Sequence, residues 1–448
     1  MQKIYIKNNG PVKEFEMEVG KFNLLIGEQA TGKSTIAKSV YFFKNIKTKL
    51  TDYLTQIYDS NSYNNVMQET TWFDKALKPE LKNIFVKLFG YSWDLNPDFY
   101  MKYEYADERW IQIRLKRGER FRQYISISYS YTLMNEVKNL QTEVRGLYES
   151  KNSMEQASLA LANEERRRNH KAIAHRVNTI FCDDKEIYYI PAGRSLLTVM
   201  SSNRAMMNSV ANVDLITDTF MMLIDDVRKS FINGVKQAHL FFPVANRLFD
   251  VKDMSDLIIG IEKGEYFYSA GREFLKIEGS EQPVAINFAS SGQQEILWLL
   301  NFIYVLMLRQ ERAFLIIEEP EAHIYPLLQK RIMEFIALFA NLDDSGVFIT
   351  THSPYVLTVA NNLYYAGVLT EEGMEREVYK AVNKNYIIKK GELSAYKLLH
   401  IPEQQGGKRY VKLLEEDERE INSALIDDVS LLVNKLYTTL YDIELDHE

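Results

Sequence analysis

The chain has 448 residues, with a hydrophobic content of 46%, a charged content of 26% and a formal net charge of −7 at pH 7. The acidic balance excludes a general attraction to nucleic acid, so any such contact needs a local basic patch. A single cysteine, Cys182, excludes an internal disulfide framework. Because the N-terminus lacks a signal-peptide core and the longest apolar stretch, Ile296–Leu308, is too short for a bilayer, we expect a soluble, cytoplasmic protein with no membrane partner.

The N-terminal segment predicts three strands. Alternating residues predict strands at Lys3–Lys7 and Lys13–Val19, with Asn8–Pro11 as the turn between them. The short apolar run Phe22–Ile26 predicts a third strand. This strand leads directly into a glycine-containing loop at residues 27–35, and a helical pattern follows that loop.

The loop at residues 27–35 reads Gly-Glu-Gln-Ala-Thr-Gly-Lys-Ser-Thr and fits the pattern G-x-x-x-x-G-K-[ST] without a mismatch. Glycines let such a loop wrap phosphates with its N–H groups, while Lys33 reaches the β- and γ-phosphates and Ser34 ligates magnesium. The sequence therefore predicts a nucleotide site with magnesium. The predicted nucleotide contacts are Gly27, Glu28, Gln29, Ala30, Thr31, Gly32, Lys33, Ser34 and Thr35.

Residues 45–98 predict helices, and three strands follow them. Phe99–Tyr105, Trp110–Lys116 and Phe121–Tyr131 predict an antiparallel meander. The tip of its second hairpin is basic; it fits a nucleic-acid contact, although a solvated polar face is favoured. The basic residues of this tip are Arg114, Lys116, Arg117, Arg120 and Arg122.

The charge-rich stretch from Leu133 to about Val177 predicts a helical hairpin, because it is almost free of glycine and proline and keeps apolar residues three or four positions apart. A second basic cluster within it is again interpreted as a solvated face. His170 and His175 have no partners at ligand spacing, so no metal site is expected there. The cluster comprises Arg166, Arg167, Arg168, His170, Lys171, His175 and Arg176.

A predicted strand at Ile187–Ile190 ends in the turn Pro191–Ser195. Within this turn Arg194 has two equal interpretations, a phosphate contact or a cap for the following helix. Residues 196–240 predict methionine-rich helices with ordinary packing. Residues 256–288 predict strands, including Phe274–Ile277 and Val284–Phe288. The methionines of the helical region include Met206, Met207, Met221 and Met222.

Two unlike motifs lie between residues 289 and 323. The first is a small turn that opens a helix, where backbone N–H groups and the helix dipole favour an anion. The second is the apolar run Phe314–Ile317, which is typical of a buried parallel strand and ends in Glu318 and Glu319. Two carboxylates at such a position favour a metal ion and a water molecule. The turn consists of Ser290, Ser291, Gly292 and Gln293.

A strand–helix–strand unit after Glu319 ends at Thr350–Pro354, which contains His352. Because the new strand would lie beside the Glu318 strand, His352 is expected to contact the γ-phosphate. His323 is expected to position a loop between subunits. The remaining chain predicts a strand or two near Tyr386–Lys389 and a C-terminal helix, Glu418–Leu440.

The order of these motifs resembles the ATP-binding cassette ATPases, in the soluble branch of RecF, SMC and OLD-type proteins. The resemblance implies that Ser290, Gly292 and Gln293 contact ATP held by the phosphate loop of another subunit. It implies that Glu318 serves magnesium, directly or through water, although the family more often has aspartate there. It also implies that Glu319 polarises the attacking water and that His352 is the switch histidine. The glutamine of the family's Q-loop is expected near Pro191–Ser195.

Further motifs resemble the small ATPases of bacterial anti-phage systems such as PARIS and Septu. They are Asn8–Pro11, Ile190–Arg194, Glu319–His323 and Thr351–Pro354. Too few residues follow His352 for the Toprim nuclease of OLD-type members. The resemblance therefore implies a separately encoded effector, such as a nuclease, and a phage-encoded trigger.

The expected fold class is α/β, an ATP-binding cassette P-loop head with an antiparallel β subdomain and a helical insertion. We divide the chain into an N-lobe at 1–195, containing the meander (99–131) and the insertion (about 132–180), a C-lobe at 196–370 and an extension at 371–448. The leading hypothesis is a sensor ATPase that forms ATP-sandwiched homodimers or larger oligomers. The alternative is a DNA-gated repair ATPase, whereas a transporter motor is disfavoured by the long segment between phosphate loop and Ser290.

Overall fold

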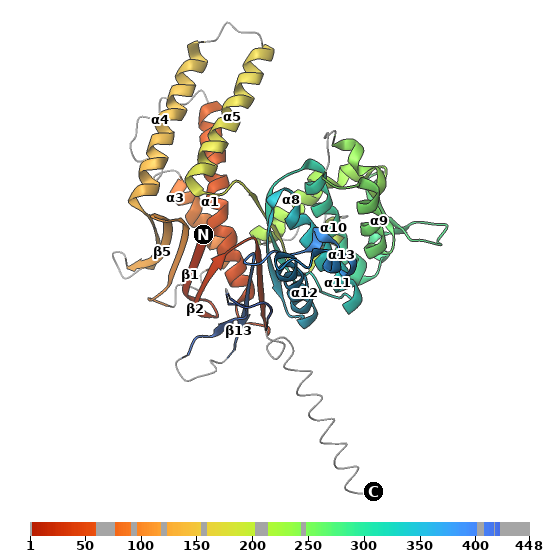
Figure 1. The fold of residues 1–448 in the computed structure, drawn as a ribbon. Helices are drawn as coiled ribbons and strands as arrows, with labels where there is room; N and C mark the ends of the chain where they lie inside the picture. Colours follow the sequence, from red (N-terminus) through yellow and green to blue (C-terminus); the bar gives the residue numbers. More distant parts are fainter. Residues whose placement is uncertain are drawn as a thin grey trace, which may run out of the picture.

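The computed structural model describes residues 2–59, 77–90, 96–117, 123–153, 159–201, 214–242, 248–400, 407–415 and 417–421. Figure 1 shows two lobes side by side, with a pair of long helices rising from the N-terminal one. The α/β class, the antiparallel subdomain and the helical insertion are confirmed. Among the described residues, no helix is long and apolar enough to cross a membrane.

A six-stranded sheet forms the centre of the fold, in the order β14-β13-β3-β12-β11-β7. Its five longer strands are parallel, and β14 pairs antiparallel at one edge. The carboxyl ends of the parallel strands therefore meet along one edge, where Glu318 pairs with Thr350 and Thr351 with Ile26. The strands are β3 (Phe22–Gly27), β7 (Glu186–Ile190), β11 (Ala313–Glu318), β12 (Gly346–Thr351), β13 (Leu393–Leu398) and β14 (Tyr410–Lys412).

The central strands are buried on both faces because their side chains alternate between two hydrophobic cores. On β11, Leu315 and Ile317 belong to the core of the second half of the chain. Phe314 and Ile316 belong to the core shared with the N-terminal helices and the antiparallel sheet. This double burial explains why β11 is a continuous apolar run rather than an alternating one.

The antiparallel sheet has the order β2-β1-β4-β5-β6, and its strands confirm both the N-terminal hairpin and the predicted meander. One face is apolar: Ile4, Ile6 and Met101 are buried. The other carries half-buried or exposed polar and aromatic residues, so the alternation of the sequence sets the two faces. The strands are β1 (Gln2–Asn9), β2 (Val12–Val19), β4 (Tyr100–Ala106), β5 (Arg109–Arg117) and β6 (Gln123–Tyr129).

The predicted helical hairpin is confirmed as α4 (Tyr131–Ser153) and α5 (Leu159–Phe181), which project from the N-terminal lobe beside α1 (Lys33–Asp59) in Figure 1. Helix α3 (Lys78–Phe89) lies in the same lobe. Arg166 and His170 on α5 both bond Asp59 at the end of α1, which ties the hairpin to that helix.

The second half of the chain is mainly helical around a small sheet of order β10-β9-β8. Its strands are β8 (Glu265–Ser269), β9 (Arg272–Lys276) and β10 (Val284–Ala285). The helices are α6 (Arg194–Ser201), α8 (Leu215–Val227), α9 (Val251–Glu262), α10 (Ser291–Arg309), α11 (Pro326–Asn341), α12 (Pro354–Glu371) and α13 (Glu375–Ala381). Short 3-10 turns lie at Arg228–Phe231, Val235–Phe241, Ile286–Phe288, Leu342–Asp344 and Lys384–Tyr386.

Two strand predictions for residues 256–288 were partly wrong. Residues 256–262 belong to helix α9, whose N-terminus is capped by the Asp250 carboxylate accepting from the N–H groups of Lys252 and Asp253. The strand predicted at Val284–Phe288 stops after Ala285, because the chain turns there into α10. Both segments have the composition of strands. The Asp250 cap favours a helix in the first segment, and the turn after Ala285 ends the strand in the second.

No strand lies at Tyr386–Lys389 itself. The strand that this part of the chain adds to the six-stranded sheet is β13, which begins at Leu393. Ile388 donates its N–H to the carbonyl of Leu363 on α12, 3.2 Å away. The chain crosses α12 so closely that a Cβ on Gly367 would lie 2.0 Å from the Ile388 oxygen. The apolar run therefore packs across α12 instead of pairing in a sheet.

Several predicted features lie outside the described residues. These are Arg120, Arg122, Met206, Met207 and the predicted C-terminal helix beyond Ile421. Residues 418–421, predicted as the start of that helix, are described and are not helical. Of the other two methionines, Met221 is buried in the core of the second half and Met222 is 63% exposed.

Candidate functional site

The loop between β3 and α1 has the close backbone approaches that require its two glycines. A Cβ on Gly27 would lie 2.7 Å from the carbonyl oxygen of Leu398 on β13. Gly32 has φ +104°, and a Cβ there would lie 2.5 Å from Val12. The loop is braced by Thr31, whose hydroxyl donates to the Glu28 carbonyl at 2.8 Å. Its position at the N-terminus of a 27-residue helix adds the helix dipole to the loop's N–H groups.

Lys33 is only 6% exposed and lies folded back into the loop. Its ammonium group donates to the carbonyl oxygens of Gly27 and Glu28, both at 2.8 Å, and lies 3.3 Å from Nδ1 of His352. Burial lowers the pKa of Lys33 to about 8, although the nearby carboxylates, Glu319 foremost, act to raise it. Because its three N–H groups are already engaged, phosphate oxygens would have to replace at least one of these partners.

His352 connects Lys33 to Glu319. Its Nδ1 faces the lysine ammonium, and its Nε2 lies 3.3 Å from a carboxylate oxygen of Glu319. Since ammonium has no acceptor, Nδ1 must accept from Lys33, and the ring proton is then assigned to Nε2, which faces Glu319. The structure thus brings three predicted site residues into one line of polar contacts across the carboxyl ends of β3, β12 and β11.

Glu318 ends β11 and is 8% exposed. One carboxylate oxygen accepts from the N–H of Ala192 at 3.3 Å, and the other is buried with no hydrogen-bond partner among the described residues. A buried, unpartnered carboxylate oxygen is costly unless it meets a cation or water. The residue therefore fits a magnesium ligand. Among the described residues no group of three or more His, Cys, Asp or Glu side chains could hold a metal. Ser34 and Glu318 would therefore supply only part of the magnesium coordination, and phosphate and water oxygens would supply the rest.

Glu319 follows β11 in a left-handed conformation, with φ 43°. This backbone is strained for a residue with a side chain, and it is held by the Glu319 N–H donating to the Thr350 carbonyl at 2.8 Å. The side chain is 36% exposed and reaches His352. The strained turn thus directs one carboxylate out of the sheet while Glu318 stays inside it.

Glu321 is a site residue for which the sequence analysis assigned no role. Its carboxylate accepts from the Thr351 hydroxyl at 2.6 Å and from the His352 backbone N–H at 2.8 Å. It therefore fixes the His352 loop to the end of β11. The available signal was the pair of motifs Glu319–His323 and Thr351–Pro354, but only the fold brings them together.

The Ser290–Gln293 turn opens α10 with a complete capping box. The Ser290 hydroxyl accepts from the Gln293 N–H, and the Gln293 side chain accepts from the Ser290 N–H. Gly292 is required because a Cβ would lie 3.0 Å from the His323 carbonyl oxygen. Within the described residues, no hydrogen bond or ion pair joins this turn to the phosphate loop of the same chain.

A cavity of about 430 Å³ lies beside this turn. It is lined by the turn itself, by Lys263 and by the loop containing His323 and Tyr325. His323 is exposed and has φ 60°. Its predicted place between subunits stays a prediction.

Arg194 has neither of the two roles considered for it. It is fully buried, and its guanidinium donates to backbone carbonyl oxygens rather than pointing at the phosphate loop. Helix α6 is capped instead by Glu295, which accepts from the N–H groups of Arg194 and Ser195. The turn Pro191–Ser195 lies beside Glu318 through Ala192, and its assignment as the Q-loop region stays a prediction.

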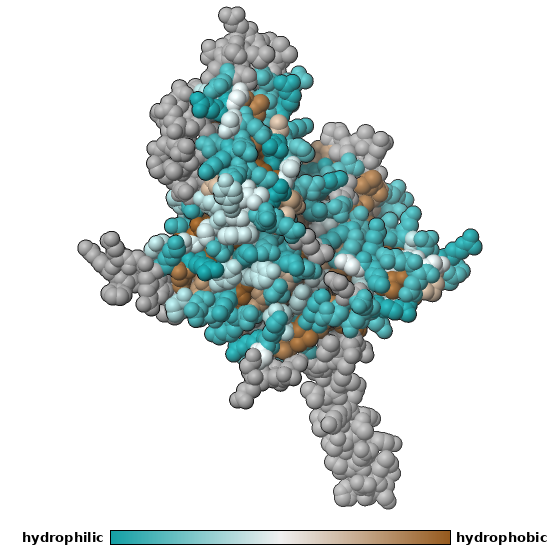
Figure 2. Space-filling view, turned by 60° about the vertical axis from the view of Figure 1, so that its left-hand side comes forward, coloured by the Kyte–Doolittle hydropathy of each residue, from teal (hydrophilic) through white to brown (hydrophobic). Residues whose placement is uncertain are grey.

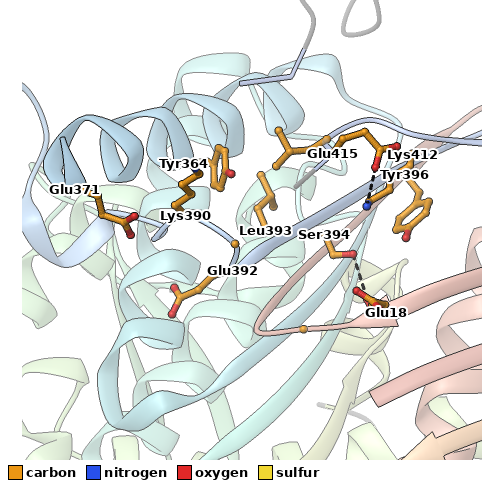
Figure 3. A pocket seen from close by; sticks show the side chains of 13 residues that line it. Glu18, Tyr364, Glu371, Lys390, Glu392, Leu393, Ser394, Tyr396, Lys412 and Glu415 are labelled. Atoms are coloured by element: carbon orange, nitrogen blue, oxygen red, sulfur yellow. Dashed lines mark hydrogen bonds and ion pairs between the residues drawn. The ribbon is translucent and has the colours of Figure 1, made fainter. Parts of the chain in front are cut away.

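A second cavity, of about 400 Å³, lies at the opposite end of the central sheet, where β3 and β13 begin (Figure 3). Four carboxylates, those of Glu18, Glu371, Glu392 and Glu415, outnumber the two lysines of its lining. Such a lining disfavours a phosphate ligand. Of the two ends of the central sheet, only the carboxyl edge is therefore a candidate nucleotide site.

The fold and the loop define a P-loop nucleotide-binding protein. Residues 1–357 match the family described as "AAA ATPase domain". The chain belongs to this family. A comparison with curated proteins finds no match.

Solved structures similar to this chain include SMC head domains. An SMC head bound to the C-terminal winged-helix domain of ScpA is 11% identical, with a TM-score of 0.41, over 92% of this chain and 97% of that one. The SMC head of Thermotoga maritima is 10% identical, with a TM-score of 0.36, over 92% and 98%. A Pyrococcus furiosus SMC head with an extended coiled coil, bound to the C-terminal domain of ScpA, is 9% identical, with a TM-score of 0.37, over 99% and 100%.

The cavity beside the turn gives a prediction about stability. Glu262 is 1% exposed, one of its carboxylate oxygens accepts from Asn301, and the other has no partner among the described residues. Burial raises the pKa of Glu262 well above its ordinary value. As pH rises above about 4.5, the unfolded chain releases this proton and the folded chain retains it, which lowers stability.

We therefore expect Glu262→Gln to raise the free energy of unfolding at pH 7. The gain over the wild type should shrink as pH falls toward about 4.5, by at most about 1.4 kcal/mol per pH unit. Urea unfolding between pH 4.5 and 8 measures it, with Glu281→Gln at an exposed position as the control. A gain that is constant with pH would contradict the prediction.

Proposed function

We propose that this chain is an ATP-binding and ATP-hydrolysing switch subunit. The observation that carries the proposal is the chain Lys33–His352–Glu319, which joins the phosphate loop to a carboxylate at the carboxyl edge of a parallel sheet. Ligands of such sheets bind at that edge. In this proposal Lys33 supplies the cation, His352 the γ-phosphate sensor and Glu319 the general base.

Each residue has a separate task in this proposal. The loop N–H groups and Lys33 stabilise the charge spread over the transferred phosphoryl group. Glu319 orients the attacking water, and His352 reports the γ-phosphate by turning its Nε2–H from Glu319 to a phosphate oxygen. Magnesium, held by Ser34 and Glu318, would neutralise the β- and γ-phosphate oxygens.

The first test concerns Lys33 and Glu319, the two residues that His352 connects. Lys33→Ala should lower ATP affinity by at least about 10-fold, since a buried cation is lost. Glu319→Gln should bind ATP normally and lose at least about 100-fold in kcat, because the amide cannot orient water as a base. Binding of a fluorescent ATP analogue and phosphate release measure the two effects. Wild-type turnover in both variants would remove the assignment.

The proposed assembly is a head-to-tail homodimer with two ATP molecules, each between a phosphate loop and a partner's Ser290–Gln293 turn. Large apolar side chains gather beside this turn: Phe288 is 83% exposed, Tyr325 74% and Leu327 65%. Tyr355 on α12, 54% exposed, is joined to this region because Ser353 bonds Gln329 of α11. Exposed apolar groups of this kind favour a protein interface, here with a second copy of the chain.

ATP should therefore drive dimerisation of the Glu319→Gln variant. Adding Tyr325→Glu should weaken the dimer by at least about 10-fold, because it places a charge in an apolar contact. Sedimentation with and without ATP measures this. Tyr131→Glu is the matched control, since Tyr131 is 82% exposed but lies at the start of α4 in the other lobe. Equal dimerisation of both variants would contradict the interface.

The biological setting that we propose is anti-phage defence. The support is the set of motifs shared with small ATPases of such systems, among them Ile190–Arg194 and Glu319–His323. In this setting the ATP-bound assembly would hold a separately encoded effector, such as a nuclease, until a phage-encoded trigger releases it. Purification of the tagged chain from its native host, with and without ATP, would identify that partner.

The second candidate function is a DNA-gated ATPase. It is favoured by three cations that lie over tyrosine rings at 4.8 to 5.7 Å, two of them from α3 over the edge strand β6 and one from β5 over β4. The other basic cluster, on α5, is partly neutralised because Arg166 pairs with Asp59 and Arg176 with Glu143. The cation–ring pairs are Arg114–Tyr100, Lys82–Tyr124 and Lys78–Tyr129.

If DNA is bound at this edge, Arg114→Ala combined with Lys116→Ala should weaken binding and reduce the slope of log affinity against log salt by about 2. Fluorescence anisotropy between 50 and 200 mM salt, about the range in which such contacts are lost, measures this. Arg167→Ala combined with Lys171→Ala, exposed on α5, is the matched control. An absence of DNA binding at low salt removes this candidate.

A further inference from the structure

Arg194 joins three segments that are far apart in the sequence. It begins α6 directly after the turn that ends β7, and it has no solvent exposure. Its Nη1 donates to the carbonyls of Pro191 at 2.8 Å and Glu318 at 2.7 Å, and its Nη2 to that of Glu319 at 2.8 Å. Its Nε donates to the carbonyl of Glu295 at 2.9 Å. The planar guanidinium is thus used as a fork between α10 and the end of β11.

Glu295 completes the pair from the side of α10. It is 1% exposed, and its carboxylate lies 3.5 Å from Nε of Arg194. The same carboxylate accepts from the backbone N–H groups of Arg194, at 3.0 Å, and Ser195, at 3.1 Å. A buried ion pair with all these hydrogen bonds keeps α6 and α10 in one relative position.

The far end of the pair is the strained turn at Glu319. A left-handed residue persists only where its surroundings hold it. Three hydrogen bonds hold this one: the Glu319 N–H donates to Thr350, and its carbonyl accepts from Arg194 and from the Ala322 N–H. A displacement of Arg194 would therefore change the direction of the Glu319 side chain.

Glu295, the other end of the pair, lies one helical turn after Ser290–Gln293 on α10. Glu295 lies in the second turn of α10, and the residues from Gln294 to Leu308 are all buried. The first turn is held by the capping box, and the Thr198 hydroxyl of α6 donates to the Gln294 carbonyl at 2.9 Å. Because α10 is packed on all sides, a shift of its N-terminus moves Glu295 with it.

We propose that Arg194 and Glu295 are positioning residues that couple the Ser290–Gln293 turn to Glu319 of the same chain. Contact of the turn with the ATP of a partner copy shifts α10, and the pair transmits that shift to the carbonyls of Glu318 and Glu319. Each subunit then hydrolyses its own ATP only when its turn is engaged. This inference rests on the proposed ATP-sandwiched dimer.

The test is a double-mutant cycle on kcat with Arg194→Lys and Ser291→Glu. Lysine keeps the charge but cannot reach all four carbonyls. Ser291 is exposed in the first turn of α10, where glutamate keeps the helix but repels phosphate. We expect Arg194→Lys to lower kcat by about 10–100-fold with KM changed by less than about 3-fold. In the Ser291→Glu variant, Arg194→Lys should lower the rate constant of hydrolysis by less than about 2-fold, measured in single turnovers.

Equal fractional losses in both backgrounds would overturn the inference, because a merely structural residue acts independently of the turn. Arg228→Lys is the matched control: Arg228 is also buried and ion-paired, with Asp225, but lies away from β11. It should leave kcat unchanged. If Arg194→Lys does not fold, Glu295→Gln replaces it, since the amide keeps one acceptor oxygen and removes the charge and the second acceptor.

A second measurement does not depend on turnover. In the Glu319→Gln variant with Arg194 and Glu295 unchanged, ATP should slow amide exchange in residues 318–324. Adding Arg194→Lys should abolish this slowing while the dimer still forms. Loss of the dimer, or unchanged protection, would overturn the coupling. If the unaltered chain neither binds nor hydrolyses ATP, the proposed function itself fails, which separates the two results.

Discussion

The parallel alignment of β3, β12 and β11 is the constraint on which the candidate site depends. Its register puts Glu318 opposite Thr350 and Thr351 opposite Ile26, so three strands from both ends of the ATPase domain end at one edge of the sheet. Lys33, His352 and Glu319 follow these ends directly. A slip of one residue would reverse the faces of the strands and move each side chain of β11 into the opposite core.

Charged groups at this edge are buried with incomplete partners. Glu318 and Glu321 each keep one carboxylate oxygen without a partner among the described residues, and Lys33 has its pKa lowered by burial. Such groups destabilise the fold unless a ligand meets them, and they cluster at functional sites. The stability of the structure is provided elsewhere, in the two hydrophobic cores on either side of the sheet.

The elements that the sequence predicted well have strong local signals. The phosphate loop, the buried run of β11 and the capped turn at Ser290 each depend on neighbouring residues, and all were found in place. Predictions were wrong where tertiary contacts override composition: Tyr386–Lys389 packs across α12, and residues 256–262 are helical because Asp250 caps α9. Propensity is a weak prior at such positions.

By itself, the sequence determined the presence of a nucleotide loop, a buried strand ending in two carboxylates, and a histidine after a second buried strand, because motif spacing and apolar runs are local properties. Only the tertiary structure decided that His352 bridges Lys33 and Glu319, that Glu321 anchors the histidine loop, and that Arg194 is buried. The physical reason is that each of these contacts joins residues from different elements. Their partners are chosen by sheet register and helix packing, which no single stretch of sequence contains.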